Sequence, residues 1–517
     1  MKDFYLTTPL YYVNDVPHIG HAYTTIAADV LARWKRVSGE KVFFLTGTDE
    51  HGAKIAKAAE DTHQTPREFV DRIASEWKKT WGALGVSNDD FIRTSEPRHQ
   101  KVVQWVFEKL KATGDIYKGS YEGWYCLHDE TYFTESELVD KKCPTCGRPV
   151  QKLKEDSYFF KLSKYELPLL DWYAAHPDFL SPKFRASEIV NFVKSGLKDL
   201  SVSRTRVAWG VPILSDPSHT VYVWFDALLN YITAAGFVAE GDGKNGPRFD
   251  DLWPADVHIV GKEIFRFHTV IWPAMLMALG LKLPKKVFAH GWWTVEGTKM
   301  SKSLGNVVDP NQMSASYGND AFRYFLLREV GFGSDGDFSE KALLSRFNSE
   351  LANNLGNLLS RTTTLIVKNF DGVVPKAAEK SVLLGDVADL TRTVASQYDA
   401  LGFGDVLETV FNVLVRTNKF IDDKAPWKMG PDQKDELALV LSECLQVLRV
   451  LTIFLSPFMP EKTEEMWKRL GEGETVASCG PRWVQELLEG RIPEFSPGQR
   501  VAKGDPLFLR KAALAPK

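Results

Sequence analysis

The amino-terminal part of the chain passes from an apolar stretch through an amphipathic stretch to a second apolar stretch, and this order constrains the fold most. The two apolar stretches, Phe4–Tyr12 and Val42–Leu45, have the length and composition of buried strands. Between them, apolar residues recur every three to four positions, which predicts one face of a helix: Ile19, Ala22, Ile26, Val30 and Trp34. A strand, a helix and a second strand in this order open a parallel α/β sheet.

Polar segments follow both predicted strands. The first, Pro17-His18-Ile19-Gly20-His21, lies between the first strand and the helix, and the second, Thr48-Asp49-Glu50, follows the second strand. Ligands of parallel α/β sheets bind outside the carboxyl ends of the strands. We therefore expect both segments to border one binding site.

The segment at His18 has the features of a phosphate site at the start of a helix. Pro17 begins it, and His18 and His21 lie three residues apart on one helical face. Exposed N–H groups and the helix dipole attract phosphate to such an end. Gly20 has no Cβ, so a flat ring can approach the backbone closely. The alternative is that the two histidines only cap the helix.

A second, cationic motif lies far from the first in the sequence. Lys299-Met300-Ser301-Lys302-Ser303 stands in a stretch bounded by Gly297 and Gly305, which predicts a mobile loop with two positive charges. On their own, the two lysines are equally typical of a solvated surface pair. Combined with the histidines, they predict an ATP site in two halves.

Changes of pattern divide the rest of the chain. Short aromatic stretches and a cysteine cluster interrupt the alternation of strands and helices, which returns with a predicted strand at Val221–Trp224. Helical periodicity becomes continuous near Leu343. The expected division is a catalytic domain in two halves (1–113 and 210–290), an inserted domain with the cysteines (114–209), a linking segment with the lysine loop (291–343) and a helical domain (344–517).

The composition excludes several classes of protein. A chain of 517 residues is too long for a single core, and five cysteines do not make a disulfide framework at this size. The amino terminus lacks the pattern of a targeting signal, and no apolar run is long enough to span a bilayer. We therefore expect a cytoplasmic protein without a membrane partner. Because the net charge is −3, a nucleic acid must be bound by a local basic surface.

The histidine and lysine motifs resemble the signature pair of the class I aminoacyl-tRNA synthetases. Further segments, in the same order, resemble the methionyl-tRNA synthetases within this class: Thr8–Asn14, Gly47–Gly52, Ser203-Arg204 with Trp209–Pro212, Tyr222–Ala227 and Gly261–Ile264. The resemblance continues into the helical tail and covers essentially the whole chain. It implies an α/β fold with a Rossmann-type parallel sheet, an inserted zinc-knuckle domain and an all-α anticodon-binding bundle.

This resemblance implies a two-step reaction. L-methionine would react with ATP, accompanied by Mg²⁺, to give methionyl-adenylate and pyrophosphate. Methionine would then pass to the 3′-terminal ribose of tRNA(Met), initiator tRNA included. Lys299 and Lys302 would offset the charge that builds on pyrophosphate, and the two histidines would donate to the phosphates. The positions carried over for ATP are His18, Gly20, His21, Lys299, Ser301 and Lys302.

The resemblance also implies a methionine site. Its positions are Leu10, Tyr12, Asp49, Trp224, Ala227, Tyr231, Ile264, His268 and Trp272. Aromatic edges pack well against sulfur, and Asp49 would hold the substrate ammonium. The alternative is that the large apolar members are simply core, because their spacings of seven and eight fit core packing equally well. Leu228 departs from family members that carry proline there.

Three cysteines suggest a metal site. Cys126, Cys143 and Cys146 match three ligands of a zinc knuckle, and Asp129 stands where zinc-bearing members of the family have the fourth cysteine. Because zinc accepts carboxylate oxygen, these four residues are a feasible ligand set, and we expect one structural Zn²⁺ per subunit. His128 is a substitute ligand one position away. The alternative is a knuckle that has lost its metal and is held by packing.

Three residues of the tail match the anticodon readers of the family. Asn357 and Arg361 are four apart on one predicted helix face, and Trp427 lies at a helix start. Trp stacks on unpaired bases, while Asn and Arg form hydrogen bonds with base edges. In a generic bundle, the same residues would be a solvated pair and a packing anchor.

Two other functions stay open at this point. One is a class I synthetase for valine, leucine, isoleucine or cysteine, although the insertion is short for an editing domain and its cysteines lie outside the expected substrate site. The other is a catalytically silent RNA-binding paralogue, which would have no need of the two histidines and two lysines. Because no domain is seen after the helical bundle, we expect a monomer.

Overall fold

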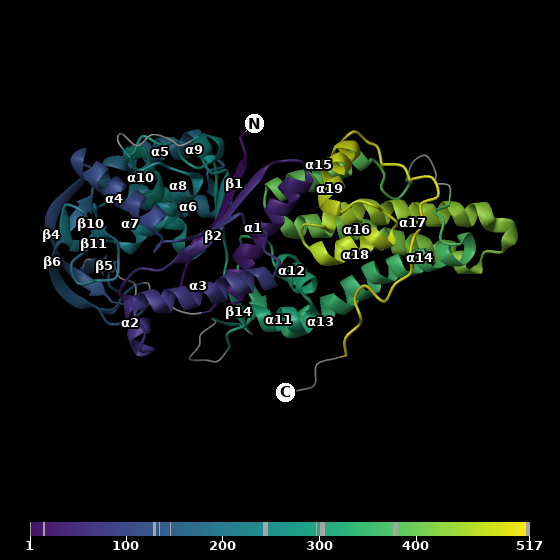
Figure 1. The fold of residues 1–517 in the computed structure, drawn as a ribbon, viewed down its shortest axis with the longest axis horizontal. Coiled ribbons are helices and arrows are strands. Elements are labelled where there is room, and N and C mark those ends of the chain that lie inside the picture. The colour runs from purple at the N-terminus through teal and green to yellow at the C-terminus, as the bar shows by residue number, and fades with distance from the viewer. Residues whose placement is uncertain are drawn as a thin grey trace. The chain divides into compact units, whose positions relative to one another are not determined.

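The computed structural model describes the whole chain except residues 1, 14–15, 128–130, 134, 145, 241–246, 296, 300–305, 376–380 and 513–517. The chain forms two compact units, each built from separate stretches of sequence (Figure 1). Unit 1 comprises Met1–Pro17, Phe43–Gly82 and Asn88–His290. Unit 2 comprises His18–Val42, Ala83–Ser87 and Gly291–Lys517.

Unit 1 is built on a six-stranded sheet. Its strand order is β3 (Asp90–Arg93), β2 (Val42–Asp49), β1 (Phe4–Tyr12), β12 (Val257–Gly261), β13 (Val287–His290) and β7 (Leu180–Ser181). The pairs β2–β3, β1–β12, β12–β13 and β13–β7 are parallel, which confirms the predicted parallel α/β sheet. The strand order reverses between β1 and β12, and α/β sheets bind ligands at the carboxyl ends of such strands.

Helices pack around this sheet in unit 1. The helical segments are α2 (Ala53–Asp61), α3 (Pro66–Ala83), α4 (Pro97–Ala112), η1 (Glu135–Glu137), η2 (Leu162–Tyr165), α5 (Glu166–Ala175), α6 (Lys183–Lys194), α7 (Val223–Leu228), α8 (Asn230–Ala235), α9 (Pro247–Leu252), η3 (Lys262–Ile264), the π-helical turn η4 (Phe267–Ile271) and α10 (Trp272–Ala278). Their apolar faces and the strands form one core, in which Trp272 and Leu45 are fully buried.

Two smaller antiparallel sheets complete unit 1. One has the order β5 (Thr131–Phe133), β4 (Ile116–Cys126), β6 (Gln151–Phe160) and β8 (Leu200–Ser201). The other has the order β10 (Pro212–Ile213), β11 (Asp216–Val221) and β9 (Ser203–Arg204). Most of these strands lie in the predicted inserted segment 114–209.

Two elements differ from the sequence-based expectation. The predicted insertion contains β7, which pairs with β13 as an edge strand of the main sheet, Leu180 opposite Val287. A two-residue strand is too short to show a periodic pattern. The predicted strand Val221–Trp224 is wrong, because β11 ends at Val221 and α7 starts at Val223. Its β-branched and aromatic residues favour a strand, and tertiary contacts override that preference.

Unit 2 is mainly helical. Its small sheet contains β15 (Thr298–Lys299), β14 (Trp293–Val295) and β16 (Gly336–Phe338). Its helical segments are α1 (Ile19–Val37), α11 (Pro310–Tyr317), α12 (Asn319–Arg328), α13 (Glu340–Arg346), η6 (Phe347–Gly356), α14 (Asn357–Phe370), α15 (Val387–Asp399), α16 (Phe403–Lys424), η7 (Pro426–Lys428), η8 (Pro431–Gln433), α17 (Lys434–Leu455), α18 (Pro460–Arg469) and α19 (Val476–Leu488). The predicted helical tail of the chain is therefore present.

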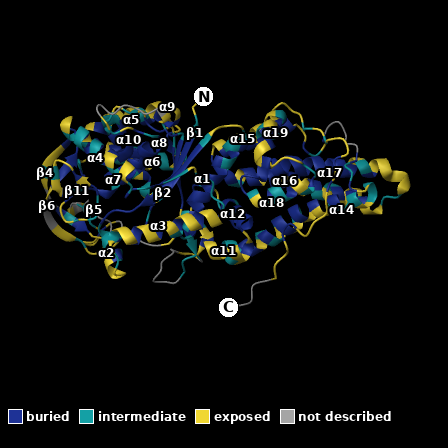
Figure 2. Ribbon diagram, in the orientation of Figure 1, coloured by how far each residue is buried: buried dark blue, intermediate teal, exposed yellow. Residues whose placement is uncertain are grey.

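The longest apolar stretch of unit 2 is its central helix. The sequence-based expectation that no apolar run could span a bilayer is wrong in one place: among the described residues, Pro431–Leu455 alone is long and apolar enough to cross a membrane. However, 89% of its apolar window is buried inside the protein. Figure 2 shows most of α17 in the buried colour, and all residues from Val440 to Leu455 are buried, as expected for the core helix of a bundle.

Helix α1 belongs to the helical unit, although it was predicted within the first half of the catalytic domain. Trp34 stacks on Tyr398 with ring centroids 4.4 Å apart, and Lys35 forms an ion pair with Asp399 at 2.8 Å. These contacts hold α1 against α15. The predicted domain boundaries stay predictions, and β7 and α1 are the elements whose membership they miss.

A fully buried ion pair fixes α1 further. Arg323 on α12 donates to Asp29 on α1 at 2.6 Å, and neither side chain is exposed. Arg323 also donates to the backbone carbonyls of Leu84, Pro457 and Phe458. One guanidinium therefore links α1, α12 and the turn between α17 and α18.

Candidate active site

The start of α1 carries the two predicted histidines in a reciprocal cap. His18 is the N-cap residue, and its Nδ1 accepts a hydrogen bond from the N–H of Gly20 at 3.1 Å. Nδ1 of His21 accepts one from the N–H of His18 at 3.2 Å. The two rings stack with centroids 3.7 Å apart. Because both Nδ1 atoms act as acceptors, the proton of each neutral ring lies on Nε2.

This cap shows that the two histidines cap the helix, and it is compatible with a phosphate role as well. The Nδ1 atoms cap the helix, and the same hydrogen bonds fix the tautomer in which Nε2 is a donor. Burial, with a further contribution from His18, holds the pKa of His21 well below its usual value, so this ring is neutral. A Cβ at Gly20 would lie 3.0 Å from Cε1 of His18, so glycine gives the imidazole its place over the backbone.

The lysine loop is described in part. Lys299 ends β15, where its backbone pairs with Thr294 of β14. Ser301 and Lys302 fall within residues 300–305, outside the described residues. The chain just after the loop reaches the start of α1, because the N–H of Ile19 donates to the carbonyl of Val308 at 3.1 Å. Both arms of the predicted ATP site thus belong to unit 2.

Asp49 is the last residue of β2, and the hydrogen bonds of its neighbours hold the turn that follows it. Its neighbour Glu50 is fully buried and receives two hydrogen bonds from Arg93, at 2.7 and 3.0 Å. Thr94 donates its hydroxyl toward Oδ1 of Asp49 at 3.5 Å and accepts from the N–H of Glu50 at 2.8 Å. The carboxylate of Asp49 therefore stands on a rigid turn at the carboxyl end of β2.

The other residues predicted for methionine also lie in unit 1. Leu10 and Tyr12 end β1, and the rest lie on α7, α8, η3, η4 and α10: Trp224, Ala227, Tyr231, Ile264, His268 and Trp272. Tyr231 and Trp272 are buried, as the core alternative predicted, and His268 is buried as well. Leu10, Tyr12, Trp224 and Ile264 are partly exposed. The set thus combines a buried group with a partly exposed one.

Hydrogen bonds order the buried members of this set. Nδ1 of His268 lies 3.0 Å from the carbonyl of Ile264, so that nitrogen carries the proton and donates. Nε2 consequently accepts from the hydroxyl of Tyr231 at 2.7 Å. Burial lowers the pKa of His268 to about 4, against a smaller raising effect of the Ile264 carbonyl. π-Helical turns such as η4 are frequent at functional sites.

A buried carboxylate that the sequence analysis did not single out lies beside this set. Asp226 on α7 accepts hydrogen bonds from His51 at 2.7 Å and from His99 at 2.8 Å. All three side chains are buried. The available sequence signal was a single charge inside the run Tyr222–Ala227, which is otherwise apolar.

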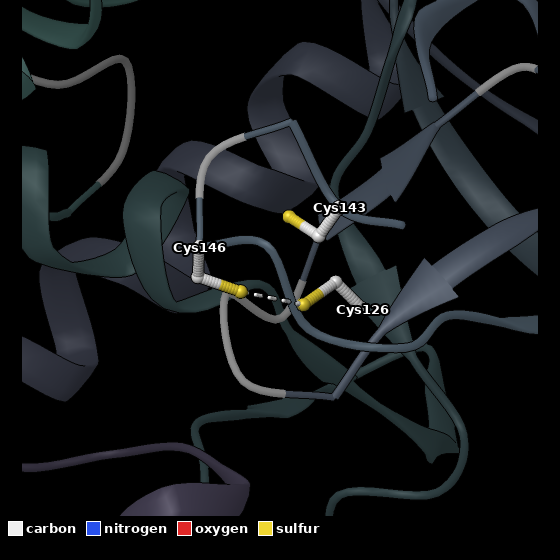
Figure 3. A group of neighbouring side chains, drawn as sticks. All are labelled: Cys126, Cys143 and Cys146. Atoms are coloured by element: carbon white, nitrogen blue, oxygen red, sulfur yellow. Dashed lines mark hydrogen bonds between the residues drawn. The ribbon is translucent and has the colours of Figure 1, made fainter. Parts of the chain in front are cut away.

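The cysteine cluster forms as predicted (Figure 3). The sulfurs of Cys126, Cys143 and Cys146 all lie within 4.8 Å of one another. Those of Cys126 and Cys146 are 3.5 Å apart, too far for a disulfide. Tetrahedral Zn–S bonds of 2.3 Å place sulfurs roughly 3.8 Å apart, so this group fits three ligands of a metal ion. Asp129 and His128 lie outside the described residues.

Two of the three predicted anticodon residues are in contact. The guanidinium of Arg361 lies 4.6 Å from the ring centroid of Trp427 and donates to Asp422 at 2.6 Å. The indole is 47% exposed. Asn357 is exposed one turn earlier on α14. The group therefore presents an aromatic face and polar edges to solvent.

The chain matches two known protein families. Residues 4–153 and 147–363 match the family described as "tRNA synthetases class I (M)". Residues 381–492 match the family described as "Anticodon-binding domain of tRNA ligase". The two matches fall on either side of residue 370, where α14 ends.

Curated relatives and solved structures agree over almost the whole chain. The methionine–tRNA ligase of Caldanaerobacter subterraneus subsp. tengcongensis is 51% identical over 98% of this chain and 79% of its own length. That of Thermotoga maritima is 46% identical over 98% and 80%. Mycobacterium tuberculosis methionyl-tRNA synthetase in complex with methionyl-adenylate has 39% identity and a TM-score of 0.92, over 99% of this chain and 100% of that one. The apo form has 37% identity and a TM-score of 0.86, over 99% of each chain.

Proposed function

The chain belongs to the class I methionine–tRNA ligases, and from this premise we propose which of its residues carry the reaction. The enzyme activates L-methionine with ATP and transfers it to tRNA, releasing AMP and diphosphate. A synthetase for valine, leucine, isoleucine or cysteine finds no support, because the relatives that match over almost the whole chain are methionine–tRNA ligases. The observation that carries the residue assignment is the reciprocal histidine cap at the start of α1.

We assign the ATP half to unit 2. The Nε2–H groups of His18 and His21 donate to the phosphates, and Gly20 leaves room for the approach of the nucleotide. Lys299, Ser301 and Lys302 complete this half from the lysine loop, whose far end is hydrogen-bonded to Ile19. ATP enters as its magnesium complex.

The first step is attack of the methionine carboxylate oxygen on the α-phosphorus of ATP. A P–O bond forms, the bond to the β-phosphate oxygen breaks, and pyrophosphate leaves with the negative charge. The carboxylate has no proton to lose, so the histidines act as hydrogen-bond donors and not as bases. Donors and cations placed where charge develops lower the barrier.

We assign the methionine half to unit 1. Asp49 pairs with the substrate ammonium, supported by its position on a turn braced by Glu50 and Arg93. Leu10, Tyr12, Trp224 and Ile264 contact the side chain, since they are the partly exposed members of the set. The buried members of the set support these contact residues: Tyr231, His268, Trp272 and Ala227. An unbranched thioether packs favourably against such aromatic edges.

We propose that the cysteine cluster holds one structural zinc ion. Three sulfurs at suitable separations support this assignment, with Asp129 as the fourth ligand. Zinc would tie β4 to the turn that carries Cys143 and Cys146. Elemental analysis of the purified protein tests the proposal, and a stable protein without metal would overturn it.

We propose that Asn357, Arg361 and Trp427 recognise the anticodon of tRNA(Met), initiator tRNA included. The exposed indole offers a stacking surface, and the neighbouring Arg361 offers donors for a base edge. Since its substrates are those of translation, we place the enzyme in the cytoplasm. We keep a monomer as the simplest assembly, which light scattering in solution tests.

The experiment that tests the assignment of the ATP half separates the two roles of His18. Asparagine at a helix start accepts a hydrogen bond much as Nδ1 does, but its side chain is too short to replace Nε2. In His18→Asn we expect the melting temperature to stay within a few degrees of wild type. We expect methionine-dependent pyrophosphate exchange to fall by about 100-fold or more, the typical effect of losing one donor to the developing charge.

Two controls complete this experiment. Thr475, the N-cap residue of α19, donates no group to the reaction, so Thr475→Asn shows the effect of the same replacement on a cap alone. Exchange with each of the other amino acids tests the substrate. If His18→Asn keeps full exchange, His18 has no phosphate role, and preferential exchange with another amino acid would refute methionine as the substrate.

A further inference from the structure

A buried carboxylate joins two segments that the proposed methionine site uses. Asp226 lies on α7 between Trp224 and Ala227, and it is fully buried. Its Oδ2 accepts a hydrogen bond from Nδ1–H of His51, two residues after Asp49, at 2.7 Å. The two partners are 175 positions apart in the sequence. One hydrogen bond thus ties the turn that carries Asp49 to the helix that carries Trp224.

The second oxygen of the same carboxylate is also used. Oδ1 of Asp226 accepts from Nε2–H of His99 on α4 at 2.8 Å. Nδ1 of His99 lies 3.2 Å from the hydroxyl of Thr233 on α8. Asp226 therefore stands where α4, α7, α8 and the turn after β2 meet, within unit 1.

The two histidines stabilise the negative charge of the buried Asp226 carboxylate. Burial by itself raises the pKa of Asp226, but His51 and then His99 bring it below its usual value. The carboxylate is therefore ionised and accepts from both rings. A buried anion needs such donors, so the loss of either one changes the position of the carboxylate or of its partners.

The turn on the His51 side is held from a third direction. The indole N–H of Trp209 donates to the carbonyl of Glu50 at 2.5 Å, and the N–H of Gly52 donates to the carbonyl of Trp209 at 3.0 Å. The edge of the Trp209 ring packs against His51, with centroids 5.5 Å apart. This side of the cluster is rigid, whereas α7 spans only Val223–Leu228 and has Asp226 as its buried polar anchor.

We propose that Asp226 is a positioning residue for methionine: through His51 and His99 it holds Asp49 and Trp224 at the separation that the substrate requires. The inference rests on the proposed contacts of Asp49 with the ammonium and of Trp224 with the side chain. Asp226 does not itself touch the substrate in this arrangement. The ammonium and the thioether lie at opposite ends of methionine, so a shift between the two segments weakens both contacts at once.

The test compares the KM for methionine with the KM for ATP in pyrophosphate exchange. Asp226→Asn keeps the shape of the side chain but cannot accept from both histidines. We expect the KM for methionine to rise about 10- to 100-fold, because a misplacement of 1 Å costs up to about 100-fold. The KM for ATP should stay within about twofold. If the cluster has only a structural role, Asp226→Asn should lower the melting temperature and leave the ratio of the KM for methionine to the KM for ATP unchanged.

The histidines provide matched variants. The amide nitrogen of asparagine replaces Nδ1 of a histidine, and that of glutamine replaces Nε2. His51→Asn and His99→Gln should therefore keep a donor for Asp226 and retain a KM for methionine within about threefold of wild type, on the scale of one hydrogen bond. His51→Gln and His99→Asn place the amide elsewhere and should behave like Asp226→Asn. If Asp226→Asn does not fold, the two His51 variants decide, and equal KM values for methionine in both would overturn the proposal.

An ion pair between a buried arginine and a partly exposed glutamate in the helical unit serves as the control. Glu472→Gln removes the carboxylate that Arg449 contacts at 2.6 Å, so it should lower stability without changing either KM. Asp49→Asn distinguishes a failure of the proposed methionine site from a failure of the positioning role of Asp226. If it leaves the KM for methionine unchanged, the proposed methionine site fails. If Asp49→Asn raises that KM and Asp226→Asn does not, only the positioning role fails.

Discussion

His268 shows how a single buried side chain takes its chemical state from its surroundings. Its Nδ1 donates to the carbonyl of Ile264, and its Nε2 accepts from Tyr231, so no nitrogen is left for a second proton. Burial adds the cost of placing a charge in an apolar core, and the pKa falls to about 4. The same logic holds for the cap at the start of α1, where the Nδ1 contacts of His18 and His21 set the tautomer.

The depressed pKa of His268 predicts a dependence of stability on pH. The unfolded chain binds a proton on this ring near pH 6.5, whereas the folded protein binds it only near pH 4. The unfolded state therefore holds more protons between these values, and stability falls as the pH decreases from about 6.5 to about 4. The contribution is on the order of 3 kcal/mol.

Denaturant unfolding of wild type and His268→Gln measures this effect. Glutamine does not titrate, so the loss of stability over that pH interval should be smaller in the variant. Other histidines contribute equally to both proteins and cancel in the difference. Parallel stability curves from pH 7 to 4 would show that His268 is not the group that resists protonation.

At the scale of the element, the contact between α14 and η7 prepares one side of the proposed anticodon site. The cation of Arg361 covers part of the indole of Trp427, and Asp422 at the end of α16 holds the guanidinium by an ion pair. The side chain of Arg361 is 32% exposed and the indole 47%. An arginine held over a half-exposed aromatic ring is a suitable platform for an unstacked base.

Replacement of the indole separates the two steps of the reaction. Trp427→Ala should lower kcat/KM for tRNA aminoacylation by about 10- to 100-fold, since a base–aromatic stack contributes about 1–3 kcal/mol. Pyrophosphate exchange should be unchanged, because it needs no tRNA. Leu439 is another exposed apolar residue of the bundle, at 49%, and Leu439→Ala is the control. Equal loss of aminoacylation in both variants would argue against a role of Trp427 in base stacking.

Elements also differ in how far the sequence predicts them. Helix α1 follows from its apolar spacing, and α17 from the helical periodicity of the tail. Val223 and Trp224, the first residues of α7, were expected in a strand because they favour strands locally, whereas in the structure they begin the helix whose Asp226 reaches His51 and His99. Strand β7 has two residues and no pattern of its own, so only its pairing with β13 defines it.

At the scale of the whole molecule, one buried arginine joins α1 to the helical bundle. Arg323 and Asp29 are both fully buried, and Asp29 also accepts from Arg33 and Ser87. Burial raises the pKa of Asp29, but Arg323 and Arg33 outweigh it and lower the value to about 2. The carboxylate is therefore charged at neutral pH.

Removing one partner of this pair should be costly. Arg323→Met leaves Asp29 and three backbone carbonyls without the guanidinium, and we expect a loss of about 3–5 kcal/mol in the free energy of unfolding. The exposed pair of Arg392 and Asp389 gives the control, because Arg392→Met should cost less than about 1 kcal/mol. Chemical unfolding curves of the two variants measure the difference. Similar losses in both would contradict the large contribution of the buried pair to the free energy of unfolding.

Local patterns of residues were enough to predict the α/β sheet, the helical tail, the cysteine cluster and the residues at the start of α1. These features depend on neighbours within a few positions or on motifs of a few residues. Contacts between distant segments set which nitrogen of each histidine carries the proton, which aromatic residues of the methionine set are buried, and that α1 packs with the bundle. The tertiary structure also brought Asp226 to His51 across 175 positions. Such contacts depend on how distant segments pack, and local periodicity does not predict which segments come into contact.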